Sequence, residues 1–146
     1  MIRALNLNEI EFLAAIDMRV NPSHWKHSSY LDAFNSPNQY IIGIFTDNNQ
    51  LAGGLVYSKV LDEAEILQIC IDTQFQKQGL AQKLFDYLLN TLIKQNIQQV
   101  FLEVRQNNHA AINLYHKAGF NIIAERKDYY RIHGKTYNAL IMAKTL

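Results

Sequence analysis

Cysteine and proline are scarce in this chain of 146 residues, which has one cysteine and two prolines. The single cysteine, Cys70, excludes an internal disulfide and fits a reducing compartment. No linker rich in proline or glycine, no internal repeat and no low-complexity tract divides the sequence. We therefore expect a single domain over residues 1–146, long enough to bury a hydrophobic core.

An excess of one sign of charge is also lacking, because the formal net charge is +1. A surface that binds bulk nucleic acid is therefore not expected, and no direct nucleic-acid partner is predicted. No apolar run approaches the roughly 20 residues that cross a bilayer, and the N-terminus lacks the apolar core of a secretory signal. These absences predict a soluble, cytoplasmic protein without a membrane partner.

Hydrophobic periodicity near the N-terminus predicts a strand followed by two helices. Ile2–Asn6 alternates like a strand, and Asn8 is expected to cap a helix over Glu9–Arg19. Asn21-Pro22-Ser23 should end that helix, and a short helix with irregular chain is expected over His24–Phe34. The apolar face of the first helix is expected to hold Ile10, Leu13, Ala14 and Met18.

The middle of the chain predicts an antiparallel meander. Turn residues at Asp47-Asn48-Asn49 and Asp62-Glu63 separate three strand-like runs, and Gly53-Gly54 is a candidate β-bulge. The three runs are Gln39–Thr46, Leu51–Leu61 and Glu65–Ile71.

The clearest helix runs from Gly79 to about Gln95, and a short buried strand, Val100–Val104, follows it. Strand, helix and strand in this order imply a crossover and a parallel pair. A last helix over Ala110–Lys117 is expected to end at Gly119. The sum is a mixed α/β sheet with helices on both faces. The apolar stripe of the long helix holds Leu80, Ala81, Leu84, Phe85, Leu88, Leu89, Leu92 and Ile93, and the closing hairpin pairs Phe120–Arg126 with Tyr137–Ala143.

The turn before the long helix reads Gln76-Lys77-Gln78-Gly79-Leu80-Ala81. A helix N-terminus offers unpaired backbone N–H groups and a positive dipole end, to which phosphate oxygens bind. Gly79 removes the side chain where approach is closest, and Lys77 adds a flexible positive charge. The turn is not a Walker loop or a dinucleotide fingerprint, because their further motif residues are missing. A glycine before a helix can also be only a turn residue, so this motif alone leaves phosphate binding open.

Several short motifs accompany this turn along the rest of the chain. The turn itself fits the pattern Gln/Arg-x-x-Gly-x-Gly/Ala, with Ala81 at its last position. With these pieces the sequence resembles the GNAT superfamily of acetyl-CoA-dependent N-acetyltransferases, from about Leu61 to Ala143. It is similar to the RimI-type branch, whose enzymes acetylate the N-terminal alanine of small-subunit ribosomal protein eighteen. The further pieces are Leu61-Asp62-Glu63-Ala64, Ile69-Cys70-Ile71-Asp72, Leu102-Glu103-Val104-Arg105, Asn108, Ala111-Ile112, Leu114-Tyr115, Gly119-Phe120 and Tyr129-Tyr130.

The resemblance implies a fold, a co-substrate and a set of roles. The fold would be a mostly antiparallel central sheet with one splayed parallel pair of strands. The co-substrate would be acetyl-CoA, with no metal. Glu103 would act as general base and Tyr115 as general acid, and Asn108 would bond to the pantetheine amides. The strand residues Ile69, Cys70 and Ile71 would pair with the pantetheine arm, and the pyrophosphate would lie on Lys77, Gln78, Gly79, Leu80, Ala81 and Gln82.

The implied chemistry suits an N-terminal amine. An α-amine has a reference pKa of about 7.7–8.0 against about 10.4 for lysine, so its deprotonation near neutral pH costs roughly 3 kcal/mol less. A carboxylate can take that proton directly or through water, and a phenol can protonate the departing thiolate. The predicted acceptor is the N-terminus of a ribosomal protein.

The same residues also have plain structural interpretations, which stay open. Glu103 could pair with Arg105 or cap the following loop, and Tyr115 could belong to the core. Asn108 could serve only as a helix cap, or as both cap and ligand. Cys70 lies inside an apolar strand and is expected to be a small buried hydrophobe.

Three further groups of residues combine charge, aromatic rings or histidines. The acidic residues Asp62, Glu63 and Glu65 fit a solvated turn, with attraction of a basic peptide as the alternative. Tyr129-Tyr130 and Arg131 could line a peptide groove or pack the last hairpin. No metal site is predicted, because the histidine pairs 24/27 and 109/116 have no carboxylate or thiol beside them.

Two rival functions remain beside N-terminal acetylation. A GNAT enzyme could act on a small amine or on a lysine side chain, and the small amine would need a deeper, more acidic pocket. A non-catalytic acyl-CoA-binding module is the other rival, and it has no need of both Glu103 and Tyr115.

Overall fold

The computed structural model describes every residue from Met1 to Leu146. Two 3₁₀ turns, Leu7–Glu9 and Thr73–Phe75, accompany the helices and strands. The helices are α1 (Ile10–Val20), α2 (His27–Asn35), α3 (Leu80–Lys94) and α4 (His109–Lys117). The strands are β1 (Ile2–Ala4), β2 (Gln39–Phe45), β3 (Leu51–Val60), β4 (Glu63–Ile71), β5 (Gln99–Arg105), β6 (Asn121–Ile132) and β7 (Lys135–Thr145).

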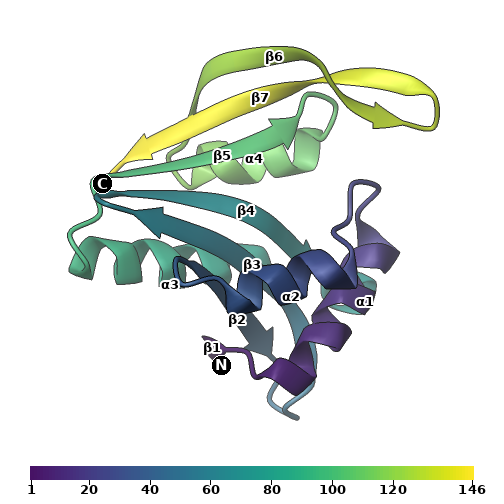
Figure 1. Cartoon of the computed structure of the whole chain (residues 1–146), viewed down its shortest axis with the longest axis vertical. Coiled ribbons are helices and arrows are strands. Elements are labelled where there is room, and N and C mark those ends of the chain that lie inside the picture. Colours follow the sequence, from purple (N-terminus) through teal and green to yellow (C-terminus); the bar gives the residue numbers. More distant parts are fainter.

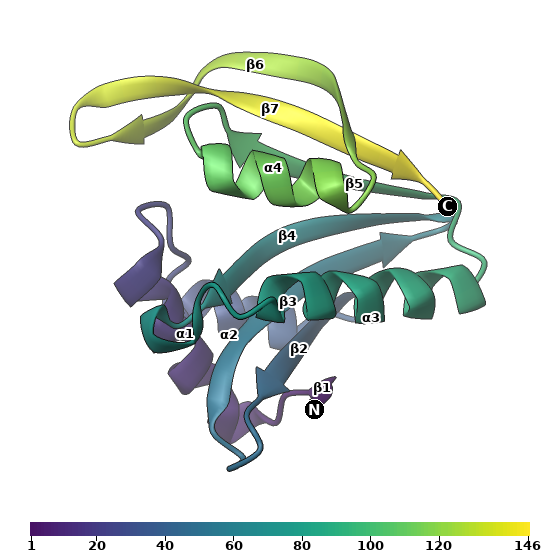
Figure 2. The same cartoon turned by 180° about the vertical axis from the view of Figure 1, so that it is seen from behind.

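One seven-stranded sheet runs through the molecule in the order β1-β2-β3-β4-β5-β7-β6. Every neighbouring pair is antiparallel except β4 and β5, which are parallel. Helices α1 and α2 cover one face of the sheet, and α3 and α4 cover the other (Figures 1 and 2). The expected mixed sheet, with one parallel pair and helices on both faces, is confirmed.

Two buried apolar clusters hold these layers together. The larger packs Leu84, Phe85 and Leu88 of α3 against the sheet, together with Tyr115 of α4. The smaller lies on the other face and joins α1 and α2 to the sheet. Ile93, expected on the apolar stripe of α3, is instead exposed near the end of the helix. No helix in the structure is both long and apolar enough to span a membrane.

Strands β4 and β5 remain paired over only four residues each, Glu63–Ile66 and Gln99–Leu102. β4 then continues to Ile71 and β5 to Arg105 without a bond between them. Figure 2 shows β5 and α4 diverging from β4, so the sheet divides into two halves on this side. The edge of β4 that faces β5 therefore has no partner strand beyond Ile66.

A β-bulge in β4 lies next to this point of divergence. Val56 pairs with Gln68 and Tyr57 pairs with Ile66, which leaves Leu67 as the extra residue. A bulge changes the side toward which the following side chain points. Gln68 accordingly lies on the side of Leu67, where its amide reaches α1 at Asp17.

The start of α1 differs from the prediction. A 3₁₀ turn over Leu7–Glu9 precedes the helix, so Asn6 rather than Asn8 flanks its start. The Glu9 carboxylate explains the shift, because it accepts a bond from the Asn6 backbone N–H at 2.8 Å and pairs with Arg3 at 2.7 Å. These two contacts close the turn ahead of Asn8.

The apolar face of α1 also differs from the prediction at one position. Met18 is 63% exposed, whereas Asp17 is fully buried. Asp17 follows Ala14 by three residues and Leu13 by four, so the buried helical stripe passes through Asp17 rather than Met18. The apolar character of methionine was a misleading guide to the face on which it lies.

Gly53 and Gly54 do not form the expected bulge. Gly53 pairs with Ile44 and with Ile71, and the irregularity between β2 and β3 falls one residue earlier, at Ala52. A Cβ atom on Gly53 would lie 2.3 Å from the carbonyl oxygen of Cys70. These glycines therefore permit close approach of neighbouring atoms instead of accommodating an extra residue.

The C-terminal elements follow the predicted order with longer strands. Gly119 has a φ of 95° just after α4, as expected for the residue that ends this helix. Strands β6 and β7 extend past the predicted limits to a tight turn at His133-Gly134. Between Arg126 and Tyr130 the register of β6 shifts by two residues relative to β7. This irregular segment supplies residues to the candidate site.

We predict that Gly53→Ala destabilises the fold by about 1–3 kcal/mol, because the added methyl group overlaps the Cys70 carbonyl oxygen and the strands must move apart. Urea unfolding would measure the change. Asn48→Ala, in the exposed turn between β2 and β3, is the control and should stay within about 0.5 kcal/mol. Equal unfolding midpoints for the two variants would show that β3 and β4 have room for a side chain.

Candidate functional site

A cavity of about 280 Å³ lies where β4 and β5 diverge. Its walls come from four parts of the chain: the α1–α2 loop, the β4 segment after the bulge, the end of β5 and helix α4. Residue Tyr130 of β6 completes the lining. All twelve expected site residues lie on β4, on β5, on α4 or its N-cap, or on the turn and the first residues of α3.

Glu103 lies in β5 and lines the cavity with a side chain that is 22% exposed. Its Oε1 is 3.2 Å from Nη1 of Arg126, so the carboxylate has a cationic partner on β6. Its expected partner Arg105 lies on the same strand and lines the cavity, but makes no ion pair with it. Glu103 is the only acidic residue of the lining.

Two neighbouring groups respond to the Glu103 charge. Burial, followed by the Glu103 charge, raises the pKa of the Glu65 carboxyl group on β4. The same two causes raise the pKa of the Tyr130 phenol. Glu103 therefore lies between a second carboxyl group, a phenol and the Arg126 guanidinium.

Tyr115 lies in α4 and is both a core residue and a cavity residue. Its ring packs edge-on against Phe85 and Phe120, with centroids 5.4 and 6.4 Å away. The hydroxyl group makes no hydrogen bond within the protein. Every fully buried side-chain nitrogen or oxygen atom of the protein has a hydrogen-bond partner, so this hydroxyl group is not fully buried. The hydroxyl group must therefore reach the open cavity. Burial is the main cause that raises the pKa of this phenol, so it keeps its proton at neutral pH.

Glu103 and Tyr115 approach the cavity from opposite faces of the sheet. Leu102 and Val104, on either side of Glu103, point into the cluster that also contains Tyr115. Alternation along a strand therefore directs Glu103 to the other face. The two side chains line one cavity because the sheet is open between β4 and β5 at this level.

The turn before α3 has the backbone form expected of an anion site. Lys77 and Gly79 both have positive φ, 63° and 77°, and nothing lies within 4 Å of where a Gly79 side chain would begin. No side chain caps α3, and the first turn contains no acidic residue. The first backbone N–H groups of the helix, from Leu80 to Gln82, donate to no protein acceptor. These groups are free to bind oxygen atoms of a ligand.

The structure places only part of this turn on the cavity. Ala81 and Gln76 belong to the lining, and Gln76 also donates through Nε2 to the Ile71 carbonyl oxygen at 3.0 Å. The other residues of the expected set do not line the cavity: Lys77, Gln78, Gly79, Leu80 and Gln82. The exposed turn thus adjoins the cavity through its first and last positions.

The expected strand residues Ile69, Cys70 and Ile71 all line the cavity. No strand pairs with their edge toward β5. The Asn21 side chain donates to the Ile69 carbonyl oxygen, and the Gln76 side chain donates to the Ile71 carbonyl oxygen. The side chain of Cys70 is buried in the smaller cluster, and burial raises the pKa of its thiol. Cys70 is thus a buried small hydrophobe, as expected, and its side chain is not available to a ligand.

Asn108 is the N-cap of α4, where its Oδ1 accepts a bond from the Ala111 backbone N–H at 3.2 Å. The residue also lines the cavity. The structural interpretation of Asn108 is therefore correct, and the amide nitrogen of its side chain remains unbonded within the protein.

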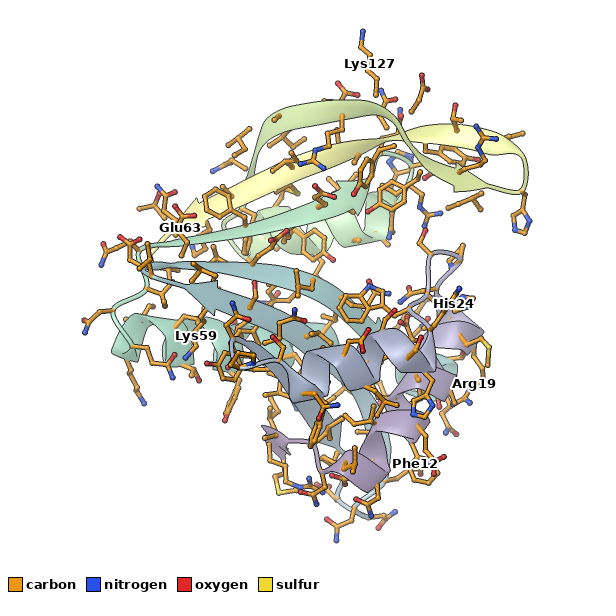
Figure 3. The ribbon with its side chains drawn as sticks, viewed as in Figure 1. Phe12, Arg19, His24, Lys59, Glu63 and Lys127 are labelled. Atoms are coloured by element: carbon orange, nitrogen blue, oxygen red, sulfur yellow. The ribbon has the colours of Figure 1, made fainter.

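The second tyrosine of the last hairpin contributes to the cavity, whereas the first does not. Tyr130 is part of the lining. Tyr129 is exposed and lies beneath the Arg126 guanidinium, 5.2 Å from its carbon atom. Lys127, between them and Arg126, extends away from the rest of the molecule (Figure 3). Tyr130 thus contributes to the cavity and Tyr129 packs on the hairpin, whereas a peptide groove at this pair stays a prediction.

Sequence reasoning missed one wall of the cavity. This wall consists of Asn21, Pro22 and Ser23 in the α1–α2 loop, together with Gln68 of the β4 bulge. The label of His24 in Figure 3 marks the position of this loop in the molecule. Behind this wall lies Asp17, which also went unnoticed, although an aspartate on the apolar stripe of α1 was a signal that could have been read from spacing.

No three histidine, cysteine or acidic side chains come together in a way that could hold a metal ion. The acidic residues near the β3–β4 turn, Asp62 and Glu63, are exposed and do not line the cavity. Glu65 is the member of that cluster whose carboxyl pKa is raised, first by burial and then by the charge of Glu103.

Comparison with known proteins identifies the family. The model of the acetyltransferase (GNAT) family matches residues 8–120. The ribosomal protein bS18-alanine N-acetyltransferase of Escherichia coli strain K12 is 32% identical over 142 residues, which cover 97% of this chain and 95% of that relative.

Solved structures agree with this likeness. The crystal structure of the ribosomal-protein-S18-alanine N-acetyltransferase from Escherichia coli has a TM-score of 0.93 and 28% identity, covering 99% of this chain and 92% of that one. Arabidopsis thaliana NAA60 in complex with acetyl-CoA shares the fold at a TM-score of 0.87 and 17% identity, covering 100% and 98% of the two chains. The chain described here therefore belongs to the GNAT family of acetyltransferases.

Proposed function

We propose that this protein transfers the acetyl group of acetyl-CoA to the N-terminal α-amine of a protein in the cytoplasm, and that the acceptor is the N-terminal alanine of ribosomal protein bS18. The observation that carries the proposal is the meeting of the Glu103 carboxylate and the free Tyr115 hydroxyl group in one cavity. The likeness to bS18-alanine N-acetyltransferases along nearly the whole chain supports the choice of acceptor.

The residues at the start of α3 fit a phosphorylated co-substrate. Backbone N–H groups without acceptors, the open space at Gly79 and the positive helix end suit a pyrophosphate, and Lys77 adds a charge at the rim. The unpaired edge at Ile69, Cys70 and Ile71 suits an extended amide chain that adds like a strand. Asn108 offers a side-chain amide nitrogen beside it.

Glu103 is the group proposed to remove the proton from the acceptor amine. An amine attacks a thioester carbonyl only in its uncharged form, and a carboxylate within direct or one-water reach can take the proton. No other acidic side chain lines the cavity, so no second candidate base competes.

Tyr115 is the group proposed to return a proton at the end of the reaction. When the carbon–sulfur bond breaks, the electron pair stays on sulfur, and a phenol that still holds its proton can donate to the thiolate. Burial keeps Tyr115 protonated, because it raises the phenol pKa above its ordinary value of 10.0. The absence of a hydrogen bond to the protein leaves the proton available to a ligand.

A small polyamine is the weaker alternative acceptor. A polycation would need several carboxylates around its binding site, whereas this cavity has one acidic and one basic residue, Glu103 and Arg105. A single amine that enters beside Glu103 is a better match to this charge, and the lower pKa of an α-amine favours it over lysine.

The acceptor is tested by measuring release of free CoA thiol from acetyl-CoA with four acceptors. A peptide that begins Ala-Arg should be acetylated. Its N-terminally blocked twin, a blocked peptide with an internal lysine, and spermidine should all be inactive. Turnover of the lysine peptide or spermidine, without turnover of the free Ala-Arg peptide, would contradict the proposed acceptor.

We predict that Glu103→Gln lowers kcat by about 10²–10⁴-fold and leaves the Kd for acetyl-CoA unchanged, because the amide cannot accept the amine proton. Arg126→Gln is the matched control, since it breaks the same 3.2 Å ion pair but keeps the carboxylate. This control should retain kcat within about tenfold. Similar losses in the two variants would assign the effect to the ion pair rather than to a base.

Tyr115→Phe should lower kcat by at least about tenfold through slower protonation of the leaving sulfur. The melting temperature should not fall, because the Tyr115 hydroxyl group makes no hydrogen bond to the protein and the ring contacts persist. Differential scanning fluorimetry and steady-state kinetics measure the two quantities. Full activity with unchanged stability would make Tyr115 a core residue only.

A further inference from the structure

Asp17 is a fully buried carboxylate that forms no ion pair. Its Oδ2 accepts hydrogen bonds from the Tyr30 hydroxyl group at 2.8 Å, the Trp25 backbone N–H at 3.0 Å and Gln68 Nε2 at 3.0 Å. Its Oδ1 accepts from Asn21 Nδ2 and, at 3.2 Å, from Gln68 Nε2. Both oxygens act only as acceptors, which is the role of an ionised carboxylate.

The burial of Asp17 is costly for the stability of the fold. An anion removed from water loses its hydration, and neutral donors alone replace only part of it. An apolar residue on the same stripe of α1 would avoid this cost and would extend the cluster around Leu13. The position of Asp17 is therefore better explained by what the carboxylate holds in place.

The groups bound to Asp17 come from both ends of the α1–α2 loop. Asn21 begins the loop and Trp25 lies near its end, while Tyr30 belongs to α2. The Asn21 amide also donates to the Ile69 carbonyl oxygen at 3.1 Å. One carboxylate thus closes the loop on itself and fastens it to β4.

The β4 bulge supplies the remaining donor. Because Leu67 is an extra residue, Gln68 points toward α1 and its Nε2 reaches Asp17. The same nitrogen lies 3.4 Å from the Ser23 carbonyl oxygen in the middle of the loop. The loop residues Asn21 and Ser23, with Gln68, line the same cavity as Glu103 and Tyr115.

From this geometry we infer that Asp17 is a positioning residue for the acceptor: it holds the α1–α2 loop against the bulged part of β4 and so fixes the wall along which the acceptor chain reaches Glu103. This inference rests on the proposed function, because it assigns the loop wall to the acceptor and the α3 side to the co-substrate. Asp17 itself does not line the cavity, so it acts through the loop and not by contact.

Trp25 gives this inference its own spectroscopic readout. It is the only tryptophan of the chain, its backbone N–H is bound to Asp17, and its ring lies 5.3 Å from the Tyr30 ring. Release of the loop should therefore increase quenching of Trp25 fluorescence by acrylamide. This signal does not depend on enzyme activity.

The test compares Asp17→Asn and Tyr30→Phe with the wild type and with Asp32→Asn, which removes an exposed carboxylate from α2. Asp17→Asn should raise the KM for the free Ala-Arg peptide by roughly tenfold and increase Trp25 quenching. The KM for acetyl-CoA should stay within about twofold, because the start of α3 lies outside the network and only one residue assigned to the co-substrate, Ile69, contacts it, through the bond from Asn21 to its carbonyl oxygen. Tyr30→Phe should change the same quantities in the same direction, and it keeps the test available if Asp17→Asn does not fold.

Different outcomes separate this inference from the proposed function. An unchanged acceptor KM despite increased Trp25 quenching would overturn the positioning role, and so would equal changes in both KM values. If the wild type acetylates a different amine, the proposed acceptor fails, and the ratio of variant to wild-type KM for that amine still decides the role of Asp17. Absence of turnover by the wild type with every acceptor would overturn both.

Discussion

The candidate site depends on the loss of pairing between β4 and β5 after four residues each. In a continuous sheet, Glu103 and Tyr115 would lie on opposite faces with a layer of backbone between them. Divergence removes that layer and leaves a cavity that both side chains reach. It also leaves a strand edge without a partner at Ile69–Ile71, which in water or in a complex must bond to something other than β5. One interruption of hydrogen bonding thus provides both the proposed acid–base pair and an edge on which an extended chain can lie.

Local patterns predicted the elements that local physics determines. The period of α3, the glycine that precedes it and the glycine that ends α4 follow from helix geometry and from backbone conformations that other residues avoid. Glu103, Tyr115 and Asn108 also fall on the cavity, although their roles came from resemblance and not from spacing. The loop wall at Asn21–Ser23 could not be predicted, because it forms only when the loop folds over β4, far away in the sequence.

Two errors near the N-terminus have one origin, the use of residue type in place of position. The apolar side chain of Met18 predicts a buried position and the charge of Asp17 predicts an exposed one, whereas the structure has the reverse. The spacing from Leu13 and Ala14 favours the opposite assignment. The bulge at Leu67 was a different kind of omission, since a strand shows its extra residue only against its partner. Without the bulge, Gln68 would face away from Asp17 and the loop would lose a contact.

The carboxylates of Asp17 and Glu103 differ in what surrounds them. Asp17 is enclosed by neutral donors on fixed backbone, whereas Glu103 has one cation, Arg126, whose side chain is 53% exposed. An exposed ion pair of this kind is weak and easily exchanged. In the proposed function a protonated acceptor amine competes with the guanidinium for Glu103, whereas an acetylated amine has no charge with which to compete. Arg126 can then return to Glu103 as the product leaves, so the ion pair of the free enzyme would oppose retention of the acetylated chain and favour turnover over product inhibition.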